Sequence, residues 1–206
     1  MSDQAASGVL YPPITPYKTD YMKVDGHEIY YELSGNPNGP TALFLHGGPG
    51  GGTSARDRCF FNPEHYRIVL MDQRGSGKSN PNASRDYEGA LFNNSTQYLI
   101  EDIELLRKEL SLDHWQLILG GSWGSTLAIS YAEQHPNQCK QLLLRGVFTA
   151  LPDEIDALFQ NGTTANHYPE EWEKYIAYIE KTSSNWTLEK QNLLAAYQKR
   201  LFDPSQ

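Results

Sequence analysis

The sequence predicts an α/β fold with a mostly parallel sheet, and two observations carry this prediction. Short apolar runs alternate with stretches of helical periodicity across residues 41–148, and such runs suit strands that are buried on both faces. Glycine-rich segments follow three of the strand-like runs directly. In sheets of this kind the site is expected at the carboxyl ends of the strands, which here are the glycine-rich turns. The 206 residues are enough to bury a core without a disulfide or a metal ion.

The first forty residues are expected to contain one hairpin. Prolines disfavour a helix within residues 1–20, which are predicted to be an irregular lead. Residues 21–33 form two β-rich runs around Asp25-Gly26, a dipeptide that favours a tight turn. A polar loop is expected at 34–40.

Four apolar runs are predicted to form the central strands, at residues 41–45, 67–71, 115–119 and 141–148. A polar loop is expected over 80–95. Leucine and isoleucine recur at helical spacing over 96–110, with Thr96 as a candidate cap. A second helix is predicted over 125–135, and it stops before Pro136.

The chain is expected to divide into two domains near residue 150. Residues 1–150 contain every predicted strand, whereas 151–206 carry aromatic and charged residues at helical spacing and are predicted to form two or three helices. One helical face in this second part gathers four large side chains. We favour ordinary packing for them over the lining of a substrate pocket; they are Trp172, Tyr175, Tyr178 and Ile179.

Composition excludes several functional classes. The formal net charge of −8 disfavours a nucleic-acid-binding protein. No apolar stretch approaches the roughly 20 residues of a membrane-spanning helix, and the N-terminus lacks the pattern of a secretory signal. Cys59 and Cys139 form no CxxC motif, so plain thiols in a reducing compartment, the cytoplasm, are expected.

The strongest chemical signal is the pentapeptide at 120–124, which matches G-x-S-x-G. It lies between a predicted buried strand and a predicted helix, which is the setting of a nucleophile elbow. Ser122 is therefore the candidate nucleophile, and Gly121 and Gly124 are the small neighbours that let strand and helix approach closely. The helix N-terminus would help to stabilise negative charge.

A second signal is the loop His46-Gly47-Gly48-Pro49-Gly50, which follows the strand at 41–45. A hydrolase with a nucleophile elbow needs a second backbone N–H donor from such a loop. Gly48 is the candidate, paired with the backbone N–H of Trp123. His46 is expected to order the loop through hydrogen bonds rather than to act as the general base.

The third signal is the segment at 72–79, which ends in Gly-Lys-Ser. A phosphate-binding loop would need glycine at position 72 and a helix directly afterwards, whereas Asp72 and an Asn-Pro-Asn turn are present. We therefore reject nucleotide binding. Asp72 and Arg74 are expected to tie this segment to the loop of residues 46–50.

The motifs HGGPG, DQRGSGKS and GGSWGSTLAISYAEQHP, in this order, resemble the proline iminopeptidase family of α/β-hydrolases. Similarity continues in RGVF at 145–148 and YPEEWEKYI at 168–176. The resemblance implies an α/β-hydrolase core followed by the start of a helical lid, here residues 151–206. It also implies an exopeptidase that releases N-terminal proline from short peptides, with Ser122 as nucleophile, Gly48 and Trp123 as the oxyanion hole, and no metal or organic cofactor.

The sequence departs from that family where the general base is needed. A serine nucleophile requires a base and an orienting carboxylate, in the order Ser, Asp, His. His135 is expected at the end of a helix and His167 within the lid-like part. No acidic residue after Ser122 follows a late strand. The resemblance places the family's acid and base beyond residue 206, so residues 1–206 look C-terminally truncated and little activity is expected of them alone. The strand at 141–148 would then be an apolar open edge.

Two other hypotheses about the function stay open. The chain could be a non-catalytic α/β-hydrolase module that binds a partner, or a related esterase or epoxide hydrolase. Epoxide hydrolases of this fold carry an aspartate at the elbow, where this chain has Ser122. The loop HGGPG and the pentapeptide favour the peptidase family over esterases. The oligomeric state stays open.

Overall fold

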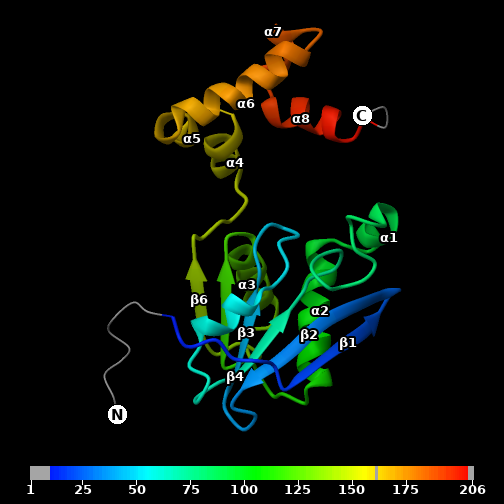
Figure 1. The fold of residues 1–206 in the computed structure, drawn as a ribbon, viewed down its shortest axis with the longest axis vertical. Helices are drawn as coiled ribbons and strands as arrows, with labels where there is room; N and C mark the ends of the chain where they lie inside the picture. The colour runs from blue at the N-terminus through cyan, green and yellow to red at the C-terminus, as the bar shows by residue number, and fades with distance from the viewer. Residues whose placement is uncertain (1–9, 161, 204–206) are drawn as a thin grey trace. The chain divides into compact units, whose positions relative to one another are not determined.

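The computed structural model describes residues 10–160 and 162–203, which belong to two compact units (Figure 1). Unit 1 ends at Phe148 and unit 2 begins at Thr149. Expectations that concern residues 1–9 and 204–206 lie outside the described residues.

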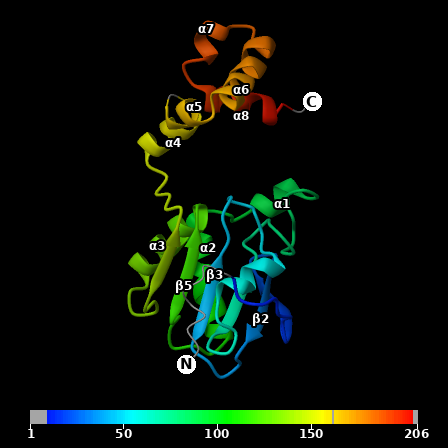
Figure 2. The same cartoon turned by 60° about the vertical axis from the view of Figure 1, so that its left-hand side comes forward.

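Unit 1 is built on one sheet of six strands in the order β1-β2-β4-β3-β5-β6 (Figures 1 and 2). The two pairings that involve β2 are antiparallel and the other three are parallel, so the sheet is mixed, with four adjacent parallel strands. The strands are β1 (Lys18–Val24), β2 (His27–Gly35), β3 (Thr41–Leu45), β4 (Arg67–Met71), β5 (Leu117–Gly121) and β6 (Leu142–Arg145).

The predicted hairpin is confirmed and is longer than expected. Asp25 and Gly26 connect β1 to β2 with φ of 49° and 81°, and positive φ at both central residues is what a tight type I′ turn requires. The hairpin begins at Lys18, which pairs with Leu33. The expected irregular lead is therefore wrong from residue 18 onward, because β1 is an edge strand with mostly exposed side chains and shows no clear alternation of apolar residues.

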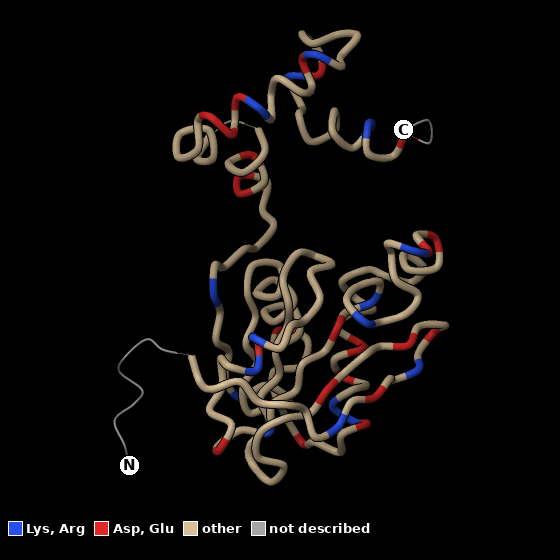
Figure 3. The backbone as a smooth tube through the Cα atoms, viewed as in Figure 1, with Lys and Arg blue, Asp and Glu red and all other residues tan. Residues whose placement is uncertain are grey.

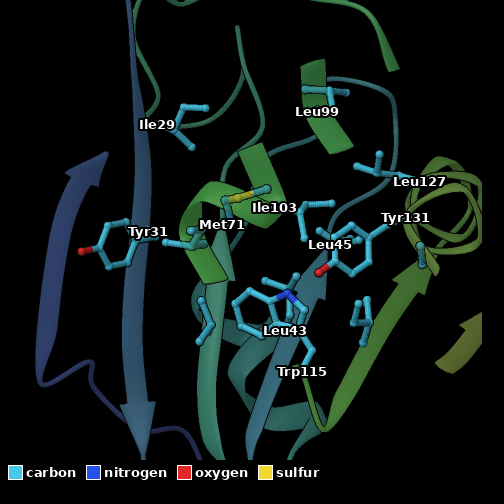
Figure 4. Packing of buried hydrophobic residues seen from close by; sticks show 14 of the residues in the cluster. Ile29, Tyr31, Leu43, Leu45, Met71, Leu99, Ile103, Trp115, Leu127 and Tyr131 are labelled. Atoms are coloured by element: carbon cyan, nitrogen blue, oxygen red, sulfur yellow. The ribbon is translucent and has the colours of Figure 1, made fainter. Parts of the chain in front are cut away.

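Alternate side chains of β3 face two separate apolar clusters. Leu43 and Leu45 belong to the larger cluster, which includes Ile103 of helix α2 (Thr96–Glu109) and Leu127 of helix α3 (Trp123–Gln134) (Figure 4). Phe44 belongs to a smaller cluster on the opposite face, next to the short helix η2 (Ala55–Phe60). Both faces of the central strands are thus apolar, which is why these strands are continuous apolar runs in the sequence.

Two local predictions in unit 1 need correction. The N-cap of α2 is Ser95, and Thr96 is the first helical residue. The expected loop at 80–95 contains a short helix, α1 (Tyr87–Leu91). The side chain of Asp86 caps α1 by accepting a hydrogen bond from the Gly89 N–H at 2.9 Å. A helix of five residues is too short to leave a periodic apolar pattern.

The described residues of unit 2 form five helical segments, where two or three were expected. The extra breaks arise at residues that cap new helices: the Asn185 and Asn192 side chains each accept a hydrogen bond from a backbone N–H of the following helix. No strand is present among the described residues of this unit. The helices are α4 (Pro152–Phe159), α5 (Thr163–His167), α6 (Pro169–Thr182), α7 (Trp186–Glu189) and α8 (Leu193–Leu201).

The aromatic face of α6 packs within unit 2. The ring of Tyr175 stacks on the ring of Tyr197 from α8 with centroids 4.6 Å apart, and Trp172 lies against Tyr175 at 5.1 Å. Ile179 is completely buried. The sequence favoured packing of this helix on the hydrolase core, whereas the contacts observed are with α8 inside unit 2.

Charged residues of both signs are interspersed along the two units (Figure 3). In the part of the chain that the structure describes, no helix combines the length and the apolarity that crossing a membrane requires.

Candidate active site

Ser122 occupies a strained turn between β5 and α3. β5 ends at Gly121, α3 begins at Trp123, and Ser122 has φ 54° and ψ −124°. A non-glycine residue rarely adopts such a conformation, which typically costs about 1–3 kcal/mol. Three hydrogen bonds anchor the turn. The Ser122 N–H donates to the Arg145 carbonyl at 3.0 Å, and the Ser122 carbonyl accepts from the Ser125 N–H at 2.8 Å and from the Ser125 hydroxyl at 2.6 Å. The Ser122 side chain is left exposed at the tip of the turn.

The first and last glycines of the pentapeptide are required by close approach. A Cβ on Gly120 would collide with the carbonyl of Gly124, and a Cβ on Gly124 would collide with the carbonyl of Leu45 in β3. In contrast, a Cβ on Gly121 would meet its nearest atom at 3.8 Å, an ordinary contact. The start of α3 can therefore lie against β3 and β5 only with glycine at positions 120 and 124.

The glycine-rich loop after β3 lies beside Ser122. A Cβ built on Gly47 would come within 3.3 Å of the Ser122 Cβ and 2.9 Å of the Gly121 carbonyl oxygen. Gly48 has φ 120° and Gly50 has φ 90°, in the region that favours glycine. Among the hydrogen bonds of the described residues, neither the Gly48 nor the Trp123 backbone N–H has an acceptor. Both candidate oxyanion donors are therefore free to bind a ligand atom.

His46 is buried and orders this loop. Its Nε2 accepts a hydrogen bond from the Gln73 backbone N–H at 3.0 Å. Its Nδ1 lies 2.9 Å from the Gly47 carbonyl oxygen and 3.2 Å from the Gly52 backbone nitrogen. Because Nε2 accepts from a backbone N–H, a neutral ring carries its proton on Nδ1. Burial lowers the pKa of His46 from its ordinary value, which favours this neutral form. Since both ring nitrogens are occupied by main-chain groups, His46 is not free to take a proton from Ser122.

Asp72 connects the two loops that follow β3 and β4. It is completely buried, and its carboxylate accepts hydrogen bonds from the Thr53 N–H at 2.6 Å and the Lys78 N–H at 2.8 Å. Thr53 lies three residues beyond the loop of residues 46–50, so Asp72 ties its segment to the continuation of that loop rather than to the loop itself.

Arg74 makes a different link from the one expected. Its guanidinium donates two hydrogen bonds of 2.7 Å to Asp102 of α2, and a third to the Asn93 carbonyl at 2.8 Å. It also lies over the ring of Tyr98. The expectation that Arg74 ties its segment to the loop of residues 46–50 is therefore wrong. Its partners come from α2, from the loop before α2 and, at 3.4 Å, from Asp25 in the turn between β1 and β2, and the local sequence does not reveal them.

Gln73 is a site residue that sequence reasoning missed. Its side-chain amide donates to the His46 carbonyl at 2.9 Å and accepts from the Trp123 indole N–H at 3.0 Å. The residue is 2% exposed. The available signal was its position two residues after the end of a buried strand, between the candidate residues Asp72 and Arg74.

A pocket of about 680 Å³ opens beside Ser122. Its apolar lining includes Phe44, Leu119 and Leu143, and its charged residues are Asp57 and Arg145. A mostly apolar pocket with few polar groups next to a nucleophile is what a small organic substrate requires.

The histidines of unit 1 make their contacts elsewhere than at Ser122. All five lie in the described part of the chain, and none is hydrogen-bonded to the Ser122 hydroxyl. His135 caps the far end of α3, whose 12 residues span about 18 Å. In unit 2, the His167 Nδ1 lies 2.7 Å from the Thr163 carbonyl oxygen. Within residues 10–160 and 162–203, no group of three or more His, Cys, Asp or Glu side chains is placed to hold a metal ion.

Comparison with protein families gives one match that covers most of the chain. A family model for the alpha/beta hydrolase fold matches residues 40–205. Among curated proteins, the chain is 47% identical over 193 residues to a proline iminopeptidase of Arabidopsis thaliana, covering 93% of this chain and 47% of the relative. It is 44% identical over 194 residues to a proline iminopeptidase of Xylella fastidiosa, covering 93% of this chain and 57% of the relative. The chain thus spans about half the length of the curated relatives it matches.

Solved structures agree on the fold. A proline iminopeptidase-related protein from Thermus thermophilus matches with a TM-score of 0.51 and 30% identity, covering 62% of this chain and 43% of that protein. An epoxide hydrolase mutant from Vigna radiata matches with a TM-score of 0.54 and 21% identity, covering 79% of this chain and 47% of that protein. The second match supports the fold alone.

Proposed function

The chain belongs to the α/β-hydrolase fold family, and on that basis we propose that it is a serine hydrolase that releases N-terminal proline from short peptides. The observation that carries the proposal is the exposed Ser122 hydroxyl at a strained strand-to-helix turn, with the loop of residues 46–50 beside it. In this proposal Ser122 attacks the carbonyl carbon of the first peptide bond. The backbone N–H groups of Gly48 and Trp123 stabilise the resulting oxyanion.

The two N–H donors account for a large part of the expected catalysis. The loss of a single oxyanion donor typically costs about 3–4 kcal/mol of transition-state stabilisation. Both proposed donors belong to the main chain and are held by rigid elements: Trp123 begins α3, and Gly48 lies on a loop that His46 and Asp72 fix to the segment after β4. Such donors need little reorganisation when charge develops.

The substrate class rests on the relatives. Curated proteins similar to this chain over nearly its whole length are named proline iminopeptidases. The apolar pocket beside Ser122 is compatible with the small ring of proline. The HGGPG loop and the pentapeptide, which favoured a peptidase over an esterase in the sequence, lie next to each other in the structure.

The general base is the part of the machinery that unit 1 does not provide to Ser122. We therefore expect residues 1–206 by themselves to hydrolyse peptides slowly. Without a base, such a site keeps only the acceleration that its oxyanion hole and binding groups give, about 10³–10⁴-fold over water. In the complete site, a histidine oriented by a carboxylate would take the Ser122 proton and pass it to the leaving amine.

Unit 2 is proposed to be the first part of a helical lid, and the cytoplasm is the proposed location. The lid is supported by the helical content of residues 149–203 and by the similarity to the relatives across this region. The location is supported by Cys59 and Cys139, which are both free thiols.

A turnover assay tests this function. Release of the fluorophore from a proline arylamide is compared with release from the matched alanine arylamide, using the chain and its Ser122→Ala variant. We expect a slow reaction that favours the proline arylamide. Ser122→Ala should keep most of this rate, because without a base the residual acceleration comes from the oxyanion hole and the binding groups. A preference for alanine would contradict the substrate class, and fast turnover that Ser122→Ala loses would contradict the expected lack of a base. A folded chain that neither turns over nor reacts with a serine-directed probe would favour the non-catalytic module.

A further inference from the structure

Gln73 lies at the junction of the three segments that form the candidate site. It is the second residue after β4, and its backbone N–H donates to His46 Nε2 at 3.0 Å. Its side-chain Nε2 donates to the His46 carbonyl at 2.9 Å, and its Oε1 accepts from the indole of Trp123 at 3.0 Å. One buried side chain thus connects the first residue of the glycine-rich loop with the residue that follows Ser122.

The orientation of this amide is fixed by its partners. A carbonyl oxygen can only accept a hydrogen bond, and an indole N–H can only donate one. The Gln73 amide nitrogen must therefore face His46, and its oxygen must face Trp123. Glutamate has no N–H for the His46 carbonyl, asparagine is one methylene shorter, and leucine can replace neither bond. The site requires a residue that donates at one end and accepts at the other.

We infer that Gln73 is a positioning residue that sets the relative placement of the two oxyanion donors, the backbone N–H groups of Gly48 and Trp123. This inference rests on the proposed function. The Gly48 donor lies two residues after His46, and the Trp123 donor belongs to the residue whose indole Gln73 holds. No other side chain among the described residues hydrogen-bonds to both His46 and Trp123.

The expected consequence is kinetic. A displacement of about 1 Å in a catalytic group can lower a rate about 10²-fold. Loss of the Gln73 bridge lets the glycine-rich loop and the elbow shift relative to each other. The chemical step should slow, whereas the binding of a ligand in the neighbouring pocket should change little, since Gln73 is not among the residues that line it.

The test measures reaction of the full chain with an alkyl fluorophosphonate. In this reaction the Ser122 oxygen forms a bond to phosphorus, the P–F bond breaks, fluoride leaves and the hydroxyl proton passes to solvent. Saturation kinetics separate the maximal rate constant of modification from the binding constant of the probe. We expect Gln73→Leu to lower the maximal rate constant about 10–100-fold with the binding constant changed by less than about threefold. Trp123→Phe, which keeps the Gln73 bond to the His46 carbonyl, should fall between Gln73→Leu and the parent chain.

A matched control separates positioning from general loss of structure. Tyr131→Phe removes a hydroxyl that donates to Glu104 at 2.9 Å, on the same helix as Trp123 but two turns further on. It should leave the rate constant of modification within about twofold of the parent value. As a spectroscopic signature, the indole N–H resonance of Trp123, assigned by its loss in Trp123→Phe, should move in Gln73→Leu and stay in place in Tyr131→Phe.

The outcomes distinguish the inference from the function on which it rests. If the parent chain is modified at Ser122 and Gln73→Leu reacts at the same rate, the positioning role is overturned and the nucleophile stands. If Tyr131→Phe slows modification as much as Gln73→Leu does, the effect is structural and the inference is likewise overturned. If the folded parent chain is not modified at Ser122, the proposed function and the inference both fail.

Discussion

The backbone at Ser122 places function and stability in conflict at a single residue. A side chain at φ 54° and ψ −124° is strained, whereas glycine adopts this conformation readily. The hydroxyl is exposed and has no hydrogen-bond partner among the described residues. The hydroxyl itself thus does nothing to offset the strain, and only the main-chain hydrogen bonds of the turn hold the conformation in place. This is expected if the conformation serves catalysis.

Replacing Ser122 should therefore stabilise unit 1 when the strain is relieved. Ser122→Ala removes the hydroxyl but keeps the Cβ and the strain, while Ser122→Gly removes both. The relief of about 1–3 kcal/mol exceeds the extra chain entropy that glycine loses on folding, about 0.5–1 kcal/mol. We expect Ser122→Gly to be about 1 kcal/mol more stable than Ser122→Ala in urea unfolding. Equal stability of the two variants would mean that Ser122 is not strained.

Several site residues could be found in the sequence, and the reason differs for each. Ser122 and its flanking glycines stand out because a tight strand-to-helix turn imposes small residues at fixed spacing. Gln73 does not stand out, because its two partners lie 27 and 50 positions away in the chain. A polar residue whose role is to bridge distant segments leaves no local pattern.

Among the elements, the strand predictions were best for β3 and β4, whereas the run at 115–119 lies two residues before the observed bounds of β5, which ends inside the glycine-rich pentapeptide at Gly121. The runs at 41–45 and 67–71 match β3 and β4 residue for residue. The last strand is shorter than the apolar run at 141–148, because its pairing with β5 ends at Gly121 and Arg145. A strand extends only as far as the neighbouring strand offers hydrogen-bond partners. The position where the neighbour ends cannot be read from the sequence of the strand itself.

α2 is held to the segment after β4 by a buried ion pair. The Arg74 and Asp102 side chains are both completely buried and share two hydrogen bonds of 2.7 Å. Breaking such a pair by removing one partner typically costs about 3–5 kcal/mol, because the remaining charge is buried without compensation. Replacing both partners by apolar residues avoids this cost.

Arg74→Met should accordingly destabilise unit 1 by about 3–5 kcal/mol. The double variant Arg74→Met with Asp102→Leu should recover a substantial part of that loss. Urea unfolding of the parent chain, both single variants and the double variant forms a complete cycle. A double variant no more stable than Arg74→Met would show that the uncompensated charge is not the source of the loss.

At the scale of the whole molecule, unit 1 presents an apolar sheet edge. β6 is the last strand in the sheet order, and Leu143 on it is 52% exposed. An exposed apolar edge strand is a template for pairing with another chain. The unpaired backbone of β6 and the neighbouring leucines should therefore promote self-association.

A charge on this edge should reduce association. We expect the parent chain to show concentration-dependent association in sedimentation velocity, and Leu143→Lys to shift it toward monomer. Leu105→Lys is the matched control, since Leu105 is also exposed but lies on α2, away from the edge. A parent chain that stays monomeric across a hundredfold range of concentration would contradict this role of β6.

The account depends most on Ser122 as the reactive group. The direct measurement is modification of the folded chain by a fluorophosphonate, followed by mass spectrometry of its peptides. We predict modification at Ser122, faster than at any other serine and absent in Ser122→Ala, because Ser122 lies beside the loop that carries one proposed oxyanion donor and directly precedes the residue that carries the other. Modification at other serines at the same rate, or none at Ser122 in a folded sample, would contradict the account.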